Sequence, residues 1–119
     1  MTDPFVAYWK QQQARRREQN RRLAQEARRD LDRIAHSLRT TYGARRIILF
    51  GSLVKDRFAA GSDIDLAVAG IAPADFFSAC AEANRLSRFR VDLKPYDDLH
   101  PRFQQRVLAQ GEVIYEASE

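Results

Sequence analysis

Residues 46–52 are RIILFGS and residues 63–69 are DIDLAVA, and these two stretches decide the fold. The first is a short, continuously apolar run ended by Gly51-Ser52, which is typical of a strand covered on both faces. The second alternates polar and apolar residues up to Gly70, which predicts another strand. Because alternate side chains of a strand share a face, we expect Asp63 and Asp65 to point together, away from the core.

A third carboxylate is predicted to join this pair. In residues 89–93 the same alternation places Phe89, Val91 and Leu93 on the core face and Asp92 on the opposite face. If the two strands are neighbours, three carboxylates gather on one open face of the sheet. Such clustering costs roughly several kcal/mol in desolvation and repulsion. Divalent cations bound through oxygen ligands remove this cost, so the pattern predicts a magnesium site.

The turn between the two strands is suited to phosphate. Gly51 lets the backbone approach a ligand closely, and Ser52 supplies a hydroxyl. The residues that follow could begin a short helix whose free N–H groups attract phosphate. Lys55 and Arg57 are candidate nucleotide contacts by their charge and position, as are two cations beside Asp92, namely Arg90 and Lys94. We therefore expect the phosphate binder and the metal binder to form one site.

The rest of the chain alternates helices and strands. The pattern predicts a long helix from Pro4 to about Thr41, helices at residues 73–87 and 101–110, and strands at residues 89–95 and 113–115. This order indicates an α+β fold with α/β alternation. We expect one domain at residues 43–119, preceded by a long basic helix at residues 1–42.

The N-terminal helix differs from the domain in charge. Residues 1–42 carry ten Lys/Arg and five acids, a net charge of +5, whereas residues 43–119 carry ten and eleven, a net charge of −1. At about 57 Å the helix is too long for the domain to cover. Its apolar tip, Phe5, Tyr8 and Trp9, must therefore fold back, fray or pack on another chain. A solvated face is the commonest meaning of the arginine run; a protein partner and RNA are alternatives, and the aromatic tip favours protein.

The composition is that of a soluble globular protein, with 45% hydrophobic and 30% charged residues. No apolar run approaches the roughly 18 residues that a membrane span needs. The start of the chain lacks the layout of a secretion signal, and the single Cys80 forms no internal disulfide. We expect a cytoplasmic protein.

The spacing Gly51-Ser52, ten residues, Asp63-Ile64-Asp65 resembles the signature of the DNA polymerase β-like nucleotidyltransferases. The residues LFGS at 49–52 and SDIDL at 62–66 are similar to the minimal nucleotidyltransferase (MNT) branch, as are VDL at 91–93 and QGEVIY at 110–115. The resemblance covers about residues 44–116 and leaves out the N-terminal helix. It implies a polymerase β-like mixed sheet with helices packed on one face.

This resemblance also implies a mechanism. Asp63 and Asp65 would ligate two magnesium ions, and Asp92 would complete the site and orient or deprotonate the incoming hydroxyl. Gly51 and Ser52 would contact the β- and γ-phosphates of ATP. One departure is the pair at 53–54, Leu-Val, where many relatives have a small or basic residue after the serine; it affects the expected shape of the loop.

Small proteins of the MNT branch resemble this chain in size, which implies an antitoxin of a HEPN–MNT toxin–antitoxin pair. Such an antitoxin would transfer AMP from ATP to a tyrosine hydroxyl of the HEPN ribonuclease, docked through the N-terminal helix. The alternatives are an antitoxin that acts by binding alone, and a nucleotidyltransferase for a small molecule or for RNA. The acceptor, the nucleotide base and a homo-oligomeric state stay open at this stage.

Overall fold

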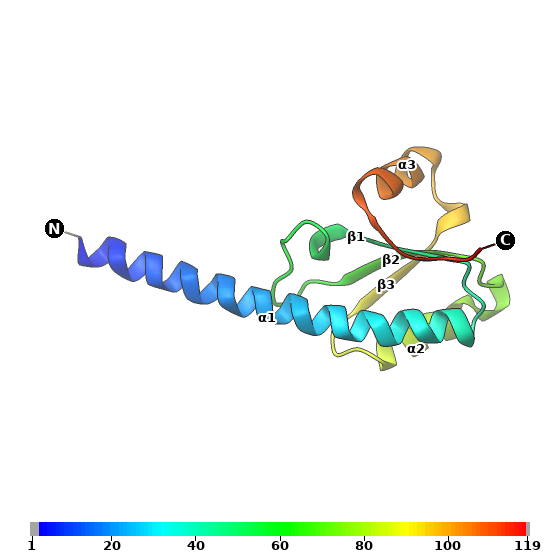
Figure 1. Cartoon of the computed structure of the whole chain (residues 1–119), viewed down its shortest axis with the longest axis horizontal. Coiled ribbons are helices and arrows are strands. Elements are labelled where there is room, and N and C mark those ends of the chain that lie inside the picture. Colours follow the sequence, from blue (N-terminus) through cyan, green and yellow to red (C-terminus); the bar gives the residue numbers. More distant parts are fainter. Residues whose placement is uncertain (1–2, 119) are drawn as a thin grey trace.

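The computed structural model describes residues 3–118, which form three α-helices and one four-stranded sheet (Figure 1). In chain order the elements are α1 (Pro4–Thr40), β1 (Arg46–Phe50), β2 (Ile64–Ala69), α2 (Phe76–Arg85), β3 (Val91–Pro95), α3 (Pro101–Gln110) and β4 (Glu112–Glu116). Short 3-10 turns lie at η1 (Gly51–Leu53), η2 (Pro73–Asp75) and η3 (Tyr96–Asp98). Every predicted element is present. The helix expected at residues 73–87 is divided into the η2 turn and a shorter α2.

The sheet is mixed, with strand order β3-β2-β1-β4. Strand β1 pairs antiparallel with β2 and with β4, whereas β2 and β3 are parallel. As its continuous apolar run predicts, β1 is central, and Ile47, Ile48 and Leu49 are all fully buried. The parallel β2–β3 pair is the arrangement that brings the predicted acidic strands together.

Helices cover both faces of the sheet. The predicted fold class is confirmed, but the expectation that the helices pack on one face only is wrong. Helices α1 and α2 pack on the face that carries Ile47 and Leu66. Helix α3 packs on the other face, where Val107 contacts Ile48 and Ala67 (Figure 1). The physical reason is that β1 buries side chains in both directions, and α3 supplies the apolar cover for the second direction.

Helix α1 begins at a side-chain cap, where the carboxylate of Asp3 accepts a hydrogen bond from the N–H of Phe5 (2.9 Å). Its buried residues start only at Ala27 and continue through Leu31, Ile34 and Leu38. Residues 4–22, here called the arm, continue the helix away from the domain (Figure 1). The arm neither folds back nor unwinds, and the molecule extends 63 Å along its longest axis.

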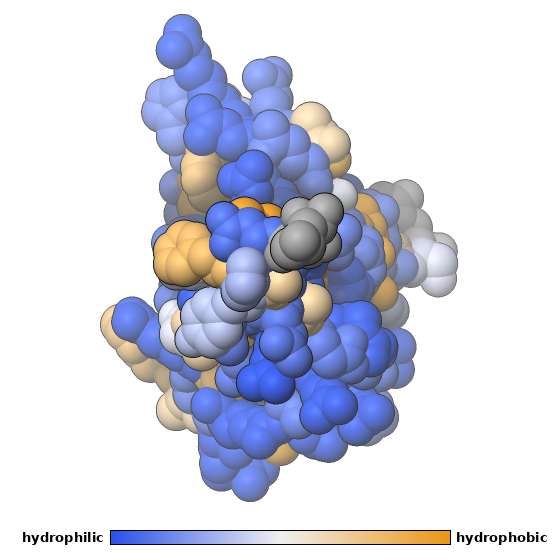
Figure 2. All heavy atoms as spheres, turned by 90° about the vertical axis from the view of Figure 1, so that its left-hand side faces the viewer, coloured by the Kyte–Doolittle hydropathy of each residue, from blue (hydrophilic) through white to orange (hydrophobic). Residues whose placement is uncertain are grey.

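Seen from the side of the arm, the surface is mostly hydrophilic, with apolar residues in separate patches (Figure 2). Within residues 3–118, no helix is long and apolar enough to cross a membrane.

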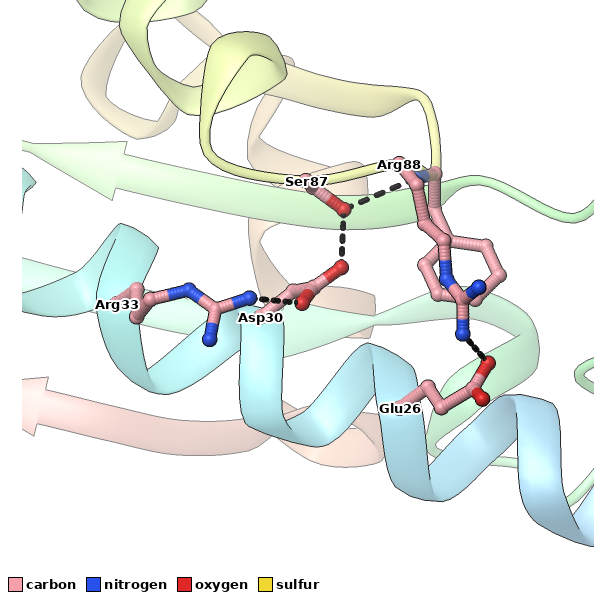
Figure 3. A network of polar contacts seen from close by, with 6 residues as sticks. Glu26, Asp30, Arg33, Ser87 and Arg88 are labelled. Atoms are coloured by element: carbon pink, nitrogen blue, oxygen red, sulfur yellow. Dashed lines mark hydrogen bonds and ion pairs between the residues drawn. The ribbon is translucent and has the colours of Figure 1, made fainter.

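A polar network ties α1 to the loop before β3 (Figure 3). The buried Asp30 accepts hydrogen bonds from Arg33 and from the hydroxyl of Ser87 (2.8 Å). The Ser87 hydroxyl in turn accepts from the N–H of Phe89 (3.0 Å), and Arg88 pairs with Glu26 of α1. The network holds the chain at the point where it enters β3, the strand that carries Asp92.

Candidate functional site

Two of the three predicted carboxylates lie side by side on neighbouring strands. Asp65 of β2 and Asp92 of β3 are register partners, on the sheet face opposite to α1 and α2. Asp63 directly precedes β2, and Phe50 at the end of β1 is the other register partner of Asp65. The end of β1 and the beginnings of β2 and β3 therefore meet at one end of the sheet, which we call the acidic end.

Gly51 packs directly against the Asp65 carboxylate. Its backbone has φ +81°, in the left-handed region that side chains rarely adopt. A Cβ at this position would lie 2.3 Å from Oδ2 of Asp65. Position 51 requires a glycine because of its left-handed backbone and because of this close approach. The turn at Gly51 and the strand that carries Asp65 therefore form one structural unit.

The electrostatics of the acidic end are unfavourable without a cation. The pKa of Asp65 is raised from 3.8 to about 6, chiefly by burial and in addition by the charges of Asp92 and Asp63, while Lys94 lowers it. The proximity of these like charges is the condition that a divalent cation relieves.

Lys94 already supplies part of this compensation. Its ammonium nitrogen lies 3.3 Å from Oδ2 of Asp92, so the two side chains form an ion pair. Among residues 3–118, no three acidic, histidine or cysteine side chains converge into a ready-made metal cage. The donor set of Asp63, Asp65 and Asp92 nevertheless fits magnesium, which takes one or two carboxylates together with water and phosphate oxygens.

A cavity of about 160 Å³ lies beside Gly51, between the end of β1 and α3. Gly51 contributes to its wall, so the cavity and the Asp65 carboxylate contact the same residue. Lys55 lines it, whereas Arg57 is exposed in the same loop and does not line it. Ser52 lies in η1, partly buried. Of the four predicted nucleotide contacts, Gly51, Ser52 and Lys55 therefore lie on or beside the cavity, and Arg57 lies apart from it.

The other wall of the cavity was missed by the sequence analysis. It comes from α3, with Phe103, Arg106, Val107 and Gln110. Their spacing of i, i+3, i+4 and i+7 marks one helix face, but this periodicity does not show which face of the sheet the helix covers. The available signal was in β1. Ile48 and Phe50 point to the same face of the sheet as Asp65, and apolar side chains on that face need a covering helix.

A family model for the nucleotidyltransferase domain of polymerase β matches residues 32–119. The chain belongs to this family. The match includes the turn, all three carboxylates and α3, and it leaves out the arm. No curated protein matches the chain.

Solved structures of nucleotidyltransferases have the same fold. One described as a minimal nucleotidyltransferase is 28% identical, with a TM-score of 0.65, covering 75% of this chain and 93% of that one. A toxin–antitoxin crystal structure with AMP-PNP is 23% identical, with a TM-score of 0.65 and 73% coverage of both chains. A mutant of the toxin–antitoxin MntA-HpeT is 23% identical, with a TM-score of 0.61, covering 73% of this chain and 72% of that one. At these identities the two toxin–antitoxin structures support the fold alone.

Proposed function

We propose that this protein is a magnesium-dependent nucleotidyltransferase that moves AMP from ATP to a tyrosine hydroxyl of a HEPN-type toxin and thereby neutralises it. The observation that carries the proposal is the juxtaposition of Asp65, Asp92 and the Gly51 turn at one end of the sheet. Family membership supports nucleotidyl transfer. The proposed class of partner is taken from what the toxin–antitoxin structures of the same fold are described as.

The chain's own residues have distinct tasks in this reaction. The backbone of Gly51 and the Ser52 hydroxyl hold the terminal phosphates, and Asp63 and Asp65 would hold magnesium together with Asp92. When bound, magnesium neutralises the phosphate charge and stabilises the attacking and leaving oxygens. Asp92 orients the phenol and accepts its proton. The phenolic oxygen forms a bond to the α-phosphorus, the bond to the β-phosphate oxygen breaks, and pyrophosphate leaves.

The arm supports a protein acceptor. Phe5, Tyr8 and Trp9 are 67%, 57% and 50% exposed, and they contact one another edge to face, with ring centroids 6.1 Å (Phe5–Trp9) and 6.3 Å (Tyr8–Trp9) apart. Exposed aromatic residues of this kind are common anchors in protein interfaces. Arginines follow them along the arm, at positions 15, 16, 17, 21 and 22, so we propose a partner surface that has an apolar pocket with an acidic region on one side of it.

The direction of the arm fits this task. The part of α1 where the arm meets the domain lies beside the loop between η1 and β2. There, Arg17 and Ala24 of α1 line a hollow together with Asp56 and Phe58. The arm therefore projects past the acidic end of the sheet (Figure 1). A partner that is held by the arm would lie beside this end of the sheet.

The test is transfer of radiolabel from α-labelled ATP to a HEPN-type toxin encoded beside this protein and co-expressed with it. We expect label on the toxin with the wild type and none with the double variant Asp63→Ala/Asp65→Ala. The matched control is Asp97→Ala/Asp98→Ala, which removes two exposed carboxylates of η3 and should leave labelling unchanged. Persistent labelling by the Asp63→Ala/Asp65→Ala protein would refute the assigned site.

A second candidate is neutralisation by contact alone, which the exposed arm and the existing Lys94–Asp92 ion pair favour. The same double variant separates the two functions. If it still binds and neutralises the toxin as well as the wild type does, neutralisation needs no transfer. If it binds the toxin but no longer neutralises it, contact alone is insufficient. The small-molecule and RNA alternatives predict labelling of those acceptors in place of the toxin.

A further inference from the structure

The cavity between the turn at Gly51 and α3 has the size and the chemistry of a nucleobase site. Its floor is the buried Val107, and Phe50 and Phe103 form an edge-to-face pair along it, with ring centroids 5.7 Å apart. Aromatic faces of this kind stack on bases without regard to sequence. With a volume of about 160 Å³, the cavity holds one base but not a whole nucleotide.

Polar groups at the cavity separate into two kinds. Lys55 from the loop and Arg106 from α3 are exposed cations, which attract the phosphates of a nucleotide. Gln110, one turn after Arg106, supplies an uncharged amide with both a donor and an acceptor. A glutamine amide can accept from N6 and donate to N7 of adenine, whereas the same edge of guanine presents two acceptors, O6 and N7, and the pyrimidines have no N7.

The position of the cavity agrees with this chemistry. Gly51 contacts the Asp65 carboxylate on one side and lines the cavity on the other. A base in the cavity would therefore be attached to phosphates that lie at the turn and the carboxylates. No motif in the sequence marks this wall, because its residues come from one face of a helix about fifty residues after the turn.

We propose that this cavity binds the adenine of ATP, with Phe103 as a stacking surface and Gln110 as the residue that selects adenine. This inference rests on the proposed function, since it takes a nucleoside triphosphate as the substrate of the acidic end. It adds the residues that decide which nucleotide is used, and it places them on α3.

The experiment is calorimetric titration of the full chain with ATP, GTP, CTP and inorganic tripolyphosphate, each with magnesium. Tripolyphosphate reports on the turn and the carboxylates without a base. We expect the wild type to bind ATP about tenfold or more tightly than CTP or tripolyphosphate. Gln110→Ala should lose the preference for ATP over GTP and CTP. Phe103→Leu, which keeps apolar volume under α3, should weaken all three nucleotides, and neither variant should alter tripolyphosphate binding.

The control is Gln105→Ala, an exposed glutamine of the same helix outside the cavity, which should bind ATP as the wild type does. If Gln110→Ala and Phe103→Leu bind ATP like the wild type while Asp63→Ala/Asp65→Ala does not, the base site is refuted and the proposed function stands. Equal wild-type affinity for ATP and tripolyphosphate would refute the base site as well. If the wild type binds none of the four ligands, both the base site and the proposed function are wrong.

Discussion

At the scale of single residues, Gly51 combines a left-handed backbone with a close approach to the Asp65 carboxylate. A methyl group at position 51 would meet Oδ2 of Asp65 at 2.3 Å, whereas one at Gly61 would have no neighbour within 4 Å. Both glycines have positive φ, +81° and +86°. A side chain at either position would therefore be placed in the same unfavourable backbone conformation, but only a side chain at position 51 would also meet the carboxylate.

This pair makes a matched experiment. Gly51→Ala and Gly61→Ala should each lower the free energy of unfolding by about 1–2 kcal/mol, because a side chain disfavours the left-handed backbone. Only Gly51→Ala should also abolish ATP binding, since its methyl group displaces the Asp65 carboxylate. Urea unfolding and calorimetry measure the two effects. ATP binding by Gly51→Ala at wild-type affinity would show that the carboxylate moves without consequence.

Asp65 also predicts how stability depends on pH. Its pKa in the folded protein is raised from 3.8 to about 6, so the folded state holds this proton more tightly than the unfolded chain does. The resulting stability is fully present below about pH 4 and is lost as pH rises through about 6. Asp65→Asn should therefore stabilise the magnesium-free protein at pH 8, by about 1 kcal/mol after solvent screening, and leave it unchanged near pH 4.

Thermal unfolding in a chelator at pH 4 and pH 8 measures this difference. Asp97→Asn, an exposed carboxylate of η3, serves as the control. A loss of stability in Asp65→Asn at pH 8 would mean that the carboxylate has a favourable partner and is not under repulsion.

At the scale of elements, the attachment of α1 to the β3 entry depends on Asp30. It is 7% exposed and accepts hydrogen bonds from Arg33 and Ser87 (Figure 3). Asp30→Ala should lower the free energy of unfolding by about 1–3 kcal/mol, because the Ser87 hydroxyl loses its acceptor in a partly buried site. Asp32→Ala, an exposed neighbour on the same helix, should change it by less than about 0.5 kcal/mol. Equal effects in chemical unfolding would contradict the structural importance of the network.

The elements also show what the sequence can predict. Strands β1 and β2 were predictable because β1 is apolar from residue 47 to residue 50 and β2 begins with an alternation of apolar and acidic residues. Burial follows the pattern in β1 and at the start of β2, whereas Ala67 is buried as well because α3 covers the second face. The Asp65–Asp92 juxtaposition followed from the same alternation once the strands were taken as neighbours. The side of the sheet on which α3 packs was not predictable from its own amphipathic pattern. Arg106 and Gln110 were missed for this reason, since their relevance depends on where α3 lies.

At the scale of the whole molecule, the arm makes the shape unusual for the length of the chain. The radius of gyration is 17.3 Å, whereas a compact chain of this length has about 13.5 Å. Residues 4–22 bury no side chain in the domain, and an isolated helix of this length is marginal in water. The sequence predicted an apolar tip beyond the reach of the domain, but it left open whether the tip folds back, frays or packs on another chain, because that depends on the surface available under it.

This geometry gives a test of whether the arm serves binding or folding. Deleting residues 1–19 should leave the free energy of unfolding within about 0.5 kcal/mol of the full chain, because the residues that pack on the sheet, from Leu23 onward, are retained. Small-angle scattering should show a longest dimension near 63 Å for the full chain and a clearly shorter one after the deletion. ATP binding should be unchanged, while toxin binding should be lost, as it should be in Phe5→Ser/Trp9→Ser. A deletion that destabilises the domain by more than about 1 kcal/mol, or a full chain whose scattering matches a compact particle, would mean that the arm packs on its own domain and is not free to hold a partner at the acidic end.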